Sequence, residues 1–205
     1  MAARPGVSPD RGRRSVAGRT IQAVIARFLG IAALGLMASA IPDLDGKLVN
    51  PFDAPAGTKA TVLLFVSTDC PISNRYAPDV RRLHERYATD GVVFRLIYAN
   101  PAESVDDIRD HLKSFSYPGT ALRDLHHDVV RQAGATITPE AVVYDSRGRL
   151  TYRGRIDDRY SAVGVERATP TKRDLQDAIA ATITGKPVAP RFTQAVGCYI
   201  ADFAR

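Results

Sequence analysis

Two continuous runs of apolar and β-branched residues predict the central strands of a sheet. Residues 61–67 and 92–98 have strand length and carry apolar side chains at both alternating sets of positions. Such runs suit strands that are buried on both faces of a sheet. Between them, apolar side chains recur at helical spacing with arginines in between, which predicts an amphipathic helix that carries Tyr76, Val80, Leu83 and Tyr87.

The later part of the chain alternates helical and strand patterns, with turn residues between them. Ser104 is a typical N-cap residue, and Gly134 and Gly185 are typical residues after a helix end. The patterns predict, in order, a helix at 104–115, a short helix at 128–133, a β-hairpin of strands 141–144 and 150–153, and a last helix at 171–184. This order predicts an α/β fold with three layers, in which helices cover both faces of a mixed central sheet.

Residues 1–40 have the pattern of an export signal. An arginine-rich stretch runs to Arg27, an apolar stretch follows, and Ala38-Ser39-Ala40 forms a small-x-small cleavage pattern. The apolar stretch is short for a transmembrane helix, which needs about 20 apolar residues. We expect cleavage after Ala40, and the alternative is an uncleaved N-terminal anchor. Either way, the domain is expected on the periplasmic or extracellular side of the membrane, with no other membrane contact.

The positive charge of the chain lies mainly in this leader. Six arginines against one aspartate give residues 1–40 a charge of +5, which leaves only +1 of the total of +6 for the rest. A nucleic-acid-binding face is therefore not predicted. We expect a globular domain at 41–186 and a tail at 187–205. The tail is too rich in apolar residues for a free disordered end and is expected to pack on the domain or on a partner.

Cys70 is the strongest candidate for a reactive residue. It follows the first buried strand and begins the long helix, within Thr68-Asp-Cys-Pro-Ile-Ser73. The amides and dipole of a helix N-terminus stabilise a thiolate and lower its pKa below about 8.5, whereas the carboxylate of Asp69 acts in the opposite direction. A thiolate attacks disulfides and peroxides. The alternative is an inert cysteine packed under the sheet.

Thr138-Pro139 stands just before the predicted hairpin. A threonine-proline bond at the start of a strand can be cis, and the alternative is an ordinary trans proline. The dipeptide alone is weak evidence for an active site. Together with Cys70 at a strand–helix junction, it indicates a thiol active site.

These two segments resemble thioredoxin-like proteins. Residues 65–73 resemble the active-site segment of that superfamily, and residues 133–149 resemble its cis-proline loop, strand and turn. The resemblance covers roughly residues 41–185 and is closest to the redoxin branch of AhpC/TSA type. The motif Cys70-Pro-Ile-Ser73 and residues 152–158 resemble an exported bacterial subgroup of that branch.

The resemblance implies a thioredoxin-like fold and a role for each matching residue. Cys70 would be the nucleophile, and the backbone beside the cis-proline Pro139 would pair with an extended substrate segment. The supporting loops would be formed by Ser67, Thr68, Ser73 and Thr138. Ser73 stands where the family has its second active-site cysteine, and a serine cannot close a vicinal disulfide.

The sequence therefore predicts an exported thiol-disulfide oxidoreductase that acts through a single nucleophilic cysteine. Protein thiols or disulfides would be its partners, with an unidentified electron donor. A thiol-dependent peroxidase is an alternative, in which Ser67 replaces the threonine of the peroxidase motif while Leu63 occupies its proline position. A non-catalytic module that binds a partner or copper is another.

Cys198 is the second of the two cysteines, and it lies in an apolar part of the tail. It could fold back and resolve a mixed disulfide or sulfenic acid on Cys70. Alternatively, the two could form a structural staple, or they could never meet.

No cofactor and no metal site is predicted. The adjacent residues His126 and His127 are expected at a helix start, on a solvated surface. Asp157 and Asp158 lie between arginines, and we expect an ion-paired turn there.

Overall fold

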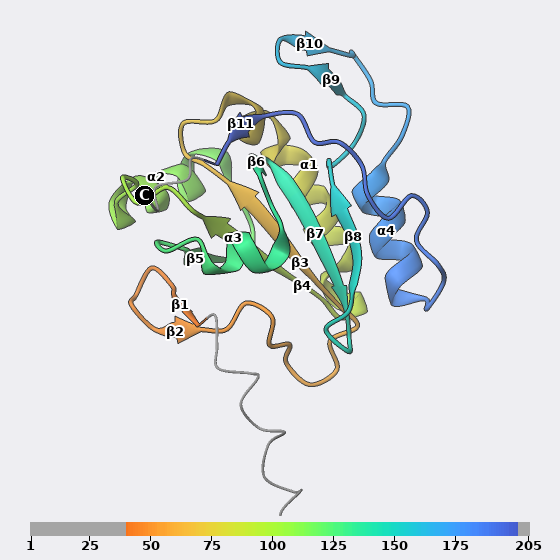
Figure 1. The fold of residues 1–205 in the computed structure, drawn as a ribbon, viewed down its shortest axis with the longest axis horizontal. Helices are drawn as coiled ribbons and strands as arrows, with labels where there is room; N and C mark the ends of the chain where they lie inside the picture. The colour runs from red at the N-terminus through yellow and green to blue at the C-terminus, as the bar shows by residue number, and fades with distance from the viewer. Residues whose placement is uncertain (1–39, 201–205) are drawn as a thin grey trace, which may run out of the picture. The chain divides into compact units, whose positions relative to one another are not determined.

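The computed structural model describes residues 40–200, which form a layered α/β domain (Figure 1). The predicted leader, its cleavage site and residues 201–205 lie outside the described residues. Within residues 40–200, no helix is long and apolar enough to cross a membrane. The α-helices are α1 (Pro71–Tyr87), α2 (Val105–Phe115), α3 (Asp128–Ala133) and α4 (Asp174–Ile183), and a 3₁₀ turn, η2, spans Ala88–Asp90.

Five strands form the central sheet, in the order β5-β4-β3-β7-β8. Strand β3 pairs parallel with β4 and antiparallel with β7, so that Phe65 lies opposite Ile97 on one side and Glu140 on the other. The mixed sheet predicted from the sequence is thus confirmed. Its strands are β3 (Ala60–Val66), β4 (Val92–Tyr98), β5 (Thr120–Arg123), β7 (Glu140–Asp145) and β8 (Leu150–Gly154).

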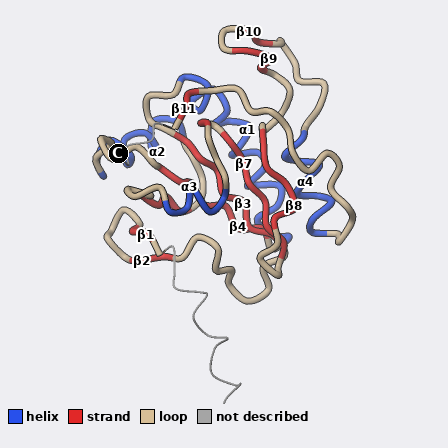
Figure 2. Tube along the Cα trace, in the orientation of Figure 1, coloured by secondary structure: helices blue, strands red, loops and turns tan. Residues whose placement is uncertain are grey.

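Helices cover both faces of the sheet, as Figure 2 shows. Alternate residues of each buried strand point to opposite faces. One face packs on α1, α2 and α4 and contributes Val62, Leu64, Phe94, Leu96 and Val143. The other face packs on α3 and contributes Leu63, Phe65, Ile97, Leu122 and Val142. This two-sided burial explains why β3 and β4 are apolar at nearly every position.

Several short elements have no counterpart in the sequence prediction. Strand β5 is one, since its four residues offer too few apolar positions for a pattern. The others are β1 (Ile41–Pro42), β2 (Leu48–Val49), β6 (Ile137–Thr138), β9 (Tyr160–Ala162), β10 (Val165–Glu166) and β11 (Cys198–Tyr199). Each has two or three residues, so its pairing depends on the surrounding fold.

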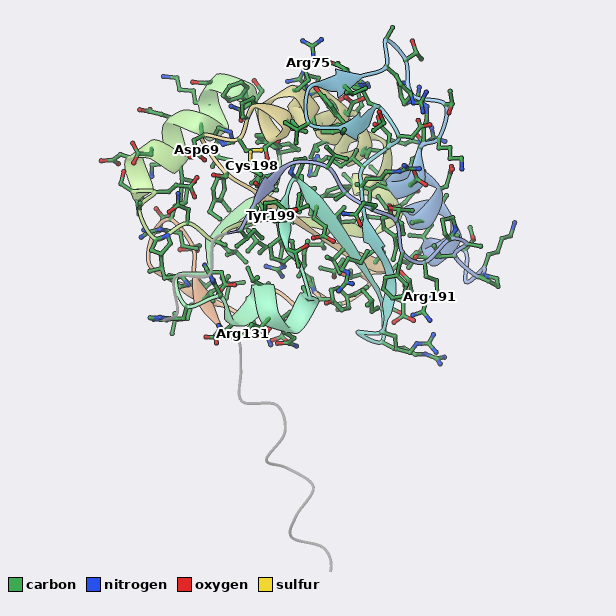
Figure 3. The ribbon with its side chains drawn as sticks, turned by 45° about the horizontal axis from the view of Figure 1, so that its top comes forward. Asp69, Arg75, Arg131, Arg191, Cys198 and Tyr199 are labelled. Atoms are coloured by element: carbon green, nitrogen blue, oxygen red, sulfur yellow. The ribbon has the colours of Figure 1, made fainter. Side chains whose placement is uncertain are left out.

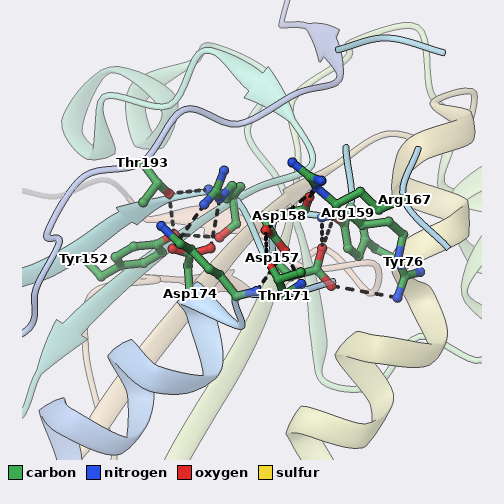
Figure 4. A network of polar contacts seen from close by, with 11 residues as sticks. Tyr76, Tyr152, Asp157, Asp158, Arg159, Arg167, Thr171, Asp174 and Thr193 are labelled. Carbon is green, nitrogen blue, oxygen red and sulfur yellow. Dashed lines mark hydrogen bonds and ion pairs between the residues drawn. The ribbon is translucent and has the colours of Figure 1, made fainter. Parts of the chain in front are cut away.

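The last helix begins at Asp174, three residues later than the sequence predicts. The carboxylate of Asp158 accepts hydrogen bonds from the backbone amides of Thr171 and Lys172, at 2.7 and 2.9 Å. These bonds hold the two residues in a loop, as Figure 4 shows for Thr171. A distant carboxylate thus competes with the helix for the same amides.

The tail packs on the domain, as its apolar residues predict. Around Arg153 of β8, the amide of Arg153 donates to the carbonyl of Arg191, and the amide of Thr193 donates to the carbonyl of Arg153. The Thr193 hydroxyl lies 2.6 Å from the Tyr152 hydroxyl and accepts from the Arg155 amide at 3.1 Å (Figure 4). The tail then crosses to β6, with which β11 pairs antiparallel.

Candidate functional site

Cys70 is placed by the junction between β3 and α1. It is the N-cap residue of α1, with Pro71 at the first helical position, and its sulfur accepts a hydrogen bond from the Ser73 amide at 3.5 Å. The residue is completely buried. The expected position of Cys70 at a helix N-terminus is confirmed, and the helix dipole there favours a thiolate.

The Thr138–Pro139 peptide bond is cis, as the sequence analysis expects. It lies next to Cys70: the Cys70 sulfur is 3.0 Å from the carbonyl oxygen of Thr138, to which a protonated thiol donates. The fold thus brings together two segments that lie far apart in the chain.

Cys198 also lies at this point. It is opposite Thr138 in the β11–β6 ladder, and its carbonyl accepts a hydrogen bond from the Thr138 hydroxyl at 3.4 Å. The Cys198 side chain forms a hydrogen bond with that of Cys70, and both cysteines are free thiols. Figure 3 shows Cys198 on the surface near Asp69, with Tyr199 next to it on the tail. Of the alternatives left open for Cys198, the structure therefore shows that the two cysteines meet.

The two thiols have opposite acidities. Burial by itself would raise the pKa of Cys70, but hydrogen bonds from Ser73 and Cys198 outweigh burial and hold that pKa below its ordinary value. Partial burial, followed by the hydrogen bond and the charge of Cys70, raises the pKa of Cys198 to about 12. Cys70 is therefore the more acidic of the two hydrogen-bonded thiols.

Glu103 supports the loop before Cys70, and the sequence analysis did not identify it. Its carboxylate accepts hydrogen bonds from the Ser67 hydroxyl at 2.9 Å and from the Thr68 amide at 2.6 Å. The Ser67 hydroxyl also contacts the carboxylate of Asp69. Glu103 is buried, and its second carboxylate oxygen has no hydrogen-bond partner within residues 40–200. Its position after β4 could have pointed to it, since the carboxyl ends of parallel strands meet at one edge.

A buried polar chain supports the other side of the loop. The Nε2 atom of His111 is 2.7 Å from the Asn74 side-chain oxygen, and its Nδ1 atom is 2.8 Å from the Tyr98 hydroxyl. Asn74 in turn donates to the carbonyl of Thr68 at 3.3 Å. Burial lowers the pKa of His111 to about 4, so the ring is neutral near pH 7. The neutral ring donates to Asn74 and accepts from Tyr98.

Ser73 is buried beneath the same loop. Its carbonyl accepts a hydrogen bond from the Tyr117 hydroxyl at 2.5 Å. Within the described residues, the Ser73 hydroxyl has no hydrogen-bond partner of normal geometry. It nevertheless lies close enough to Cys70 to lower the pKa of that thiol. A side chain at this position therefore lies next to the Cys70 sulfur.

Two cavities meet at Cys198. One, of about 280 Å³, is lined by Ser67, Asp69, Asn100, Thr138 and Cys198, among others. The other, of about 460 Å³, is lined by Pro71, Ile72, Tyr160, Val163 and Cys198, among others. Cys198 lines both cavities, and the Cys70 side chain to which it is hydrogen-bonded is buried.

A comparison with protein families identifies the family of the domain that carries this site. The model of the AhpC/TSA family matches residues 36–153, which include Cys70 and Pro139. The chain belongs to the AhpC/TSA family. Cys198 lies outside the segment that matches the AhpC/TSA model, so the contact of its tail with the site is a feature beyond the shared domain.

Solved structures agree with the fold of this AhpC/TSA protein. An uncharacterized conserved protein from Geobacillus kaustophilus is 25% identical, with a TM-score of 0.71 over 81% of this chain and 89% of its own. A hypothetical protein from Sinorhizobium meliloti 1021 is 26% identical, with a TM-score of 0.67 over 80% and 91%. A thioredoxin-like protein from Aeropyrum pernix is 13% identical, with a TM-score of 0.50 over 71% and 87%. No curated protein matches the chain. The expected thioredoxin-like fold is confirmed.

The sequence analysis also singled out two aspartates and two histidines away from Cys70. Asp157 accepts a hydrogen bond from the Tyr76 hydroxyl at 2.5 Å and pairs with Arg159, as Figure 4 shows. His126 is exposed, but the expectation of a solvated surface is wrong for His127. His127 is buried, and its ring is hydrogen-bonded to the carbonyl of Ala99 at 2.7 Å. Across the described part of the chain, no three His, Cys, Asp or Glu side chains are grouped as a metal site.

Proposed function

We propose that this protein is an exported thiol-disulfide oxidoreductase of the redoxin type, in which Cys70 is the nucleophile and Cys198 is the second redox cysteine. Membership of the AhpC/TSA family supports thiol chemistry. The leader pattern of residues 1–40 supports export. The observation that carries the proposal is the hydrogen-bonded pair of thiols, in which Cys70 is the more acidic and lies at a helix N-terminus.

The proposed reaction begins at Cys70. Its thiolate attacks one sulfur of a disulfide, forms a mixed disulfide with it and releases the other sulfur as a thiolate. The Cys198 thiol then loses its proton, attacks the Cys70 sulfur and releases the remaining thiolate. The protein ends with a Cys70–Cys198 disulfide, and the two electrons have passed to the substrate. An external dithiol would return the protein to its reduced form.

The acidity of Cys198 fits this order of steps. In the resting protein, burial and then the hydrogen bond and charge of Cys70 raise the pKa of Cys198 to about 12, so Cys198 stays protonated. Once Cys70 is part of a mixed disulfide, that charge is gone, and the pKa of Cys198 falls toward its ordinary value. The second thiol therefore loses its proton more readily once the first has reacted.

Single-cysteine variants test the assignment. With oxidised glutathione, the natural protein should form a Cys70–Cys198 disulfide, which non-reducing peptide mapping detects. Cys198→Ser should instead accumulate glutathione on Cys70, because nothing resolves the adduct. Cys70→Ser should react much more slowly at its remaining thiol. Faster modification of Cys198 in Cys70→Ser than of Cys70 in Cys198→Ser would contradict the assignment of the nucleophile.

The surroundings of Cys70 favour disulfides over peroxides as substrates. None of the hydrogen bonds that the Cys70 sulfur makes among residues 40–200 comes from an arginine. A peroxidase needs donors that stabilise the developing negative charge of the leaving oxygen. Hydrogen peroxide in place of oxidised glutathione is therefore the matched substrate control, and we expect slower oxidation of Cys70 by it.

A further inference from the structure

The edge of β6 is a place where an extended segment is held directly against the reactive sulfur. The carbonyl of Thr138 contacts Cys70 at 3.0 Å, and the backbone of Thr138 pairs with the segment opposite it. Any strand that pairs antiparallel with β6 therefore has one residue facing Cys70. In the resting protein, this strand is the tail of the same chain, and the residue is Cys198.

The tail fits this edge through its glycine. A β-carbon on Gly197 would lie 2.0 Å from the carbonyl oxygen of Thr138, a distance that no side chain tolerates. Beyond it, the amide of Ile200 donates to the carbonyl of Thr136 at 3.0 Å. The edge thus accepts a strand whose residue before the cysteine is glycine, because the two backbones approach very closely there.

The covering strand is short and can separate from the edge. The β11–β6 ladder has only two residue pairs, and so short a pairing is weak by itself. Residues 191–193 are bound separately to β8, and the Thr193 hydroxyl is tied to Tyr152 and Arg155. The end of the tail can therefore leave β6 while its base stays attached, which is a local opening of low cost.

We propose that the Gly197–Ile200 strand is a built-in competitor for a strand-binding site at the edge of β6. The resemblance to thioredoxin-like proteins already implies an extended substrate segment at this edge, and we add that this segment carries a glycine before its cysteine, as the tail does. With the tail in place, Cys70 is fully buried and closed to such a segment. When the tail leaves, the partner segment pairs with β6 and brings its sulfur to Cys70. The proposal rests on the function proposed for Cys70 and adds the kind of partner and its competitor.

The first test compares a small and a large reagent for the same thiol. In the Cys198→Ser protein, Cys70 is the sole remaining cysteine. Its alkylation is measured with N-ethylmaleimide and with a maleimide carried on a long polyethylene glycol chain. Adding Gly197→Val should raise the rate with the large reagent about tenfold relative to the small one, because the strand can no longer pair with β6. Tyr199→Thr is the matched control, since it lies in the same strand and its side chain is 83% exposed.

The ratio of the two rates separates the two proposals. If Gly197→Val leaves the ratio unchanged, the tail does not close Cys70 and the inference is wrong. If N-ethylmaleimide reacts with Cys70 of the Gly197→Val, Cys198→Ser protein no faster than with a free thiol at the same pH, the nucleophile assignment fails, while the ratio still reports on the tail. Thermal unfolding of both variants verifies that the domain is intact.

The second test asks what the edge binds. A peptide with the sequence of residues 195–200 carries thionitrobenzoate on its cysteine, and attack by Cys70 releases this coloured thiolate. The Gly197→Val, Cys198→Ser protein should react with the peptide about tenfold faster than the Cys198→Ser protein does. A peptide with valine in place of its glycine should lose this gain. Equal rates for the two peptides would show that the edge of β6 is not the binding site.

Discussion

Cys198 lies opposite Thr138 in a two-residue antiparallel ladder, and the carbonyl of Thr138 lies 3.0 Å from the sulfur of Cys70. One residue of β6 therefore contacts both cysteines of the chain, one through its carbonyl and the other through strand pairing. This relationship makes the tail part of the site, although the tail lies outside the segment that matches the AhpC/TSA family.

Replacing Cys198 should make Cys70 less acidic. The hydrogen bond from the Cys198 thiol is one of those that lower the pKa of Cys70. We expect Cys198→Ala to raise the pKa of Cys70, measured from the pH dependence of its alkylation by iodoacetamide. Cys198→Ser is the control, because its hydroxyl still donates and should give a smaller rise. A pKa that is the same in all three proteins would mean that the Cys198 hydrogen bond does not stabilise the thiolate.

Thr193→Val should weaken the Cys70–Cys198 disulfide. The substitution removes the hydroxyl that interacts with Tyr152 and Arg155, and the base of the tail loosens. Two hydrogen bonds of about 1 kcal/mol each correspond to roughly a thirtyfold shift toward the reduced form in equilibrium with glutathione. Gln194→Ala is the control, since the side chain of Gln194 is exposed and bonds only to the neighbouring carbonyl of Ala195. An equal equilibrium constant in both variants would contradict an anchoring role for Thr193.

Ser73→Cys should create a second partner for Cys70. Ser73 is buried next to the Cys70 sulfur, and its backbone amide lies 3.5 Å from that sulfur. We expect oxidation to join Cys70 to the new thiol within one tryptic peptide, leaving Cys198 free for alkylation, and reduction of insulin to become faster than in the natural protein. Ser73→Ala serves as the control for loss of the hydroxyl. Exclusive formation of the Cys70–Cys198 disulfide in Ser73→Cys would show that the tail outcompetes the loop.

Acid should destabilise the fold through His111. The pKa of this histidine is about 4 in the folded protein and about 6.5 in an unfolded chain, because burial disfavours the charged ring. Its contribution to stability is therefore fully present above pH 6.5 and is lost as the pH falls from 6.5 toward 4. The free energy of unfolding should decrease there with a slope approaching about 1.4 kcal/mol per pH unit. His111→Gln should show a smaller slope than the natural protein in urea titrations at each pH, and parallel slopes would refute the assignment.

Local sequence patterns predicted most of the sheet and the first helices. The strands at 60–66 and 92–98 are apolar on both faces because helices cover both faces of the sheet. Their burial can therefore be predicted from the apolar composition of the two segments. The capping box formed by Ser104 and Asp107 fixes the start of α2 in the same local way. The start of α4 could not be predicted, because the carboxylate of Asp158 binds the amides of Thr171 and Lys172 from outside the helix.

For the site, the sequence by itself determined the position of Cys70 after a buried strand and before a helix, together with the Thr138–Pro139 dipeptide, because both depend on neighbouring residues. Only the tertiary structure decided that Glu103 holds the loop before Cys70 and that Cys198 lies against Cys70. These contacts join segments that are distant in the chain. The local sequence pattern around each residue therefore does not indicate which distant residue it contacts. The pairing of β11 with β6 has just two residue pairs, too short for any periodicity, and depends on the backbone fit of Gly197 against Thr138.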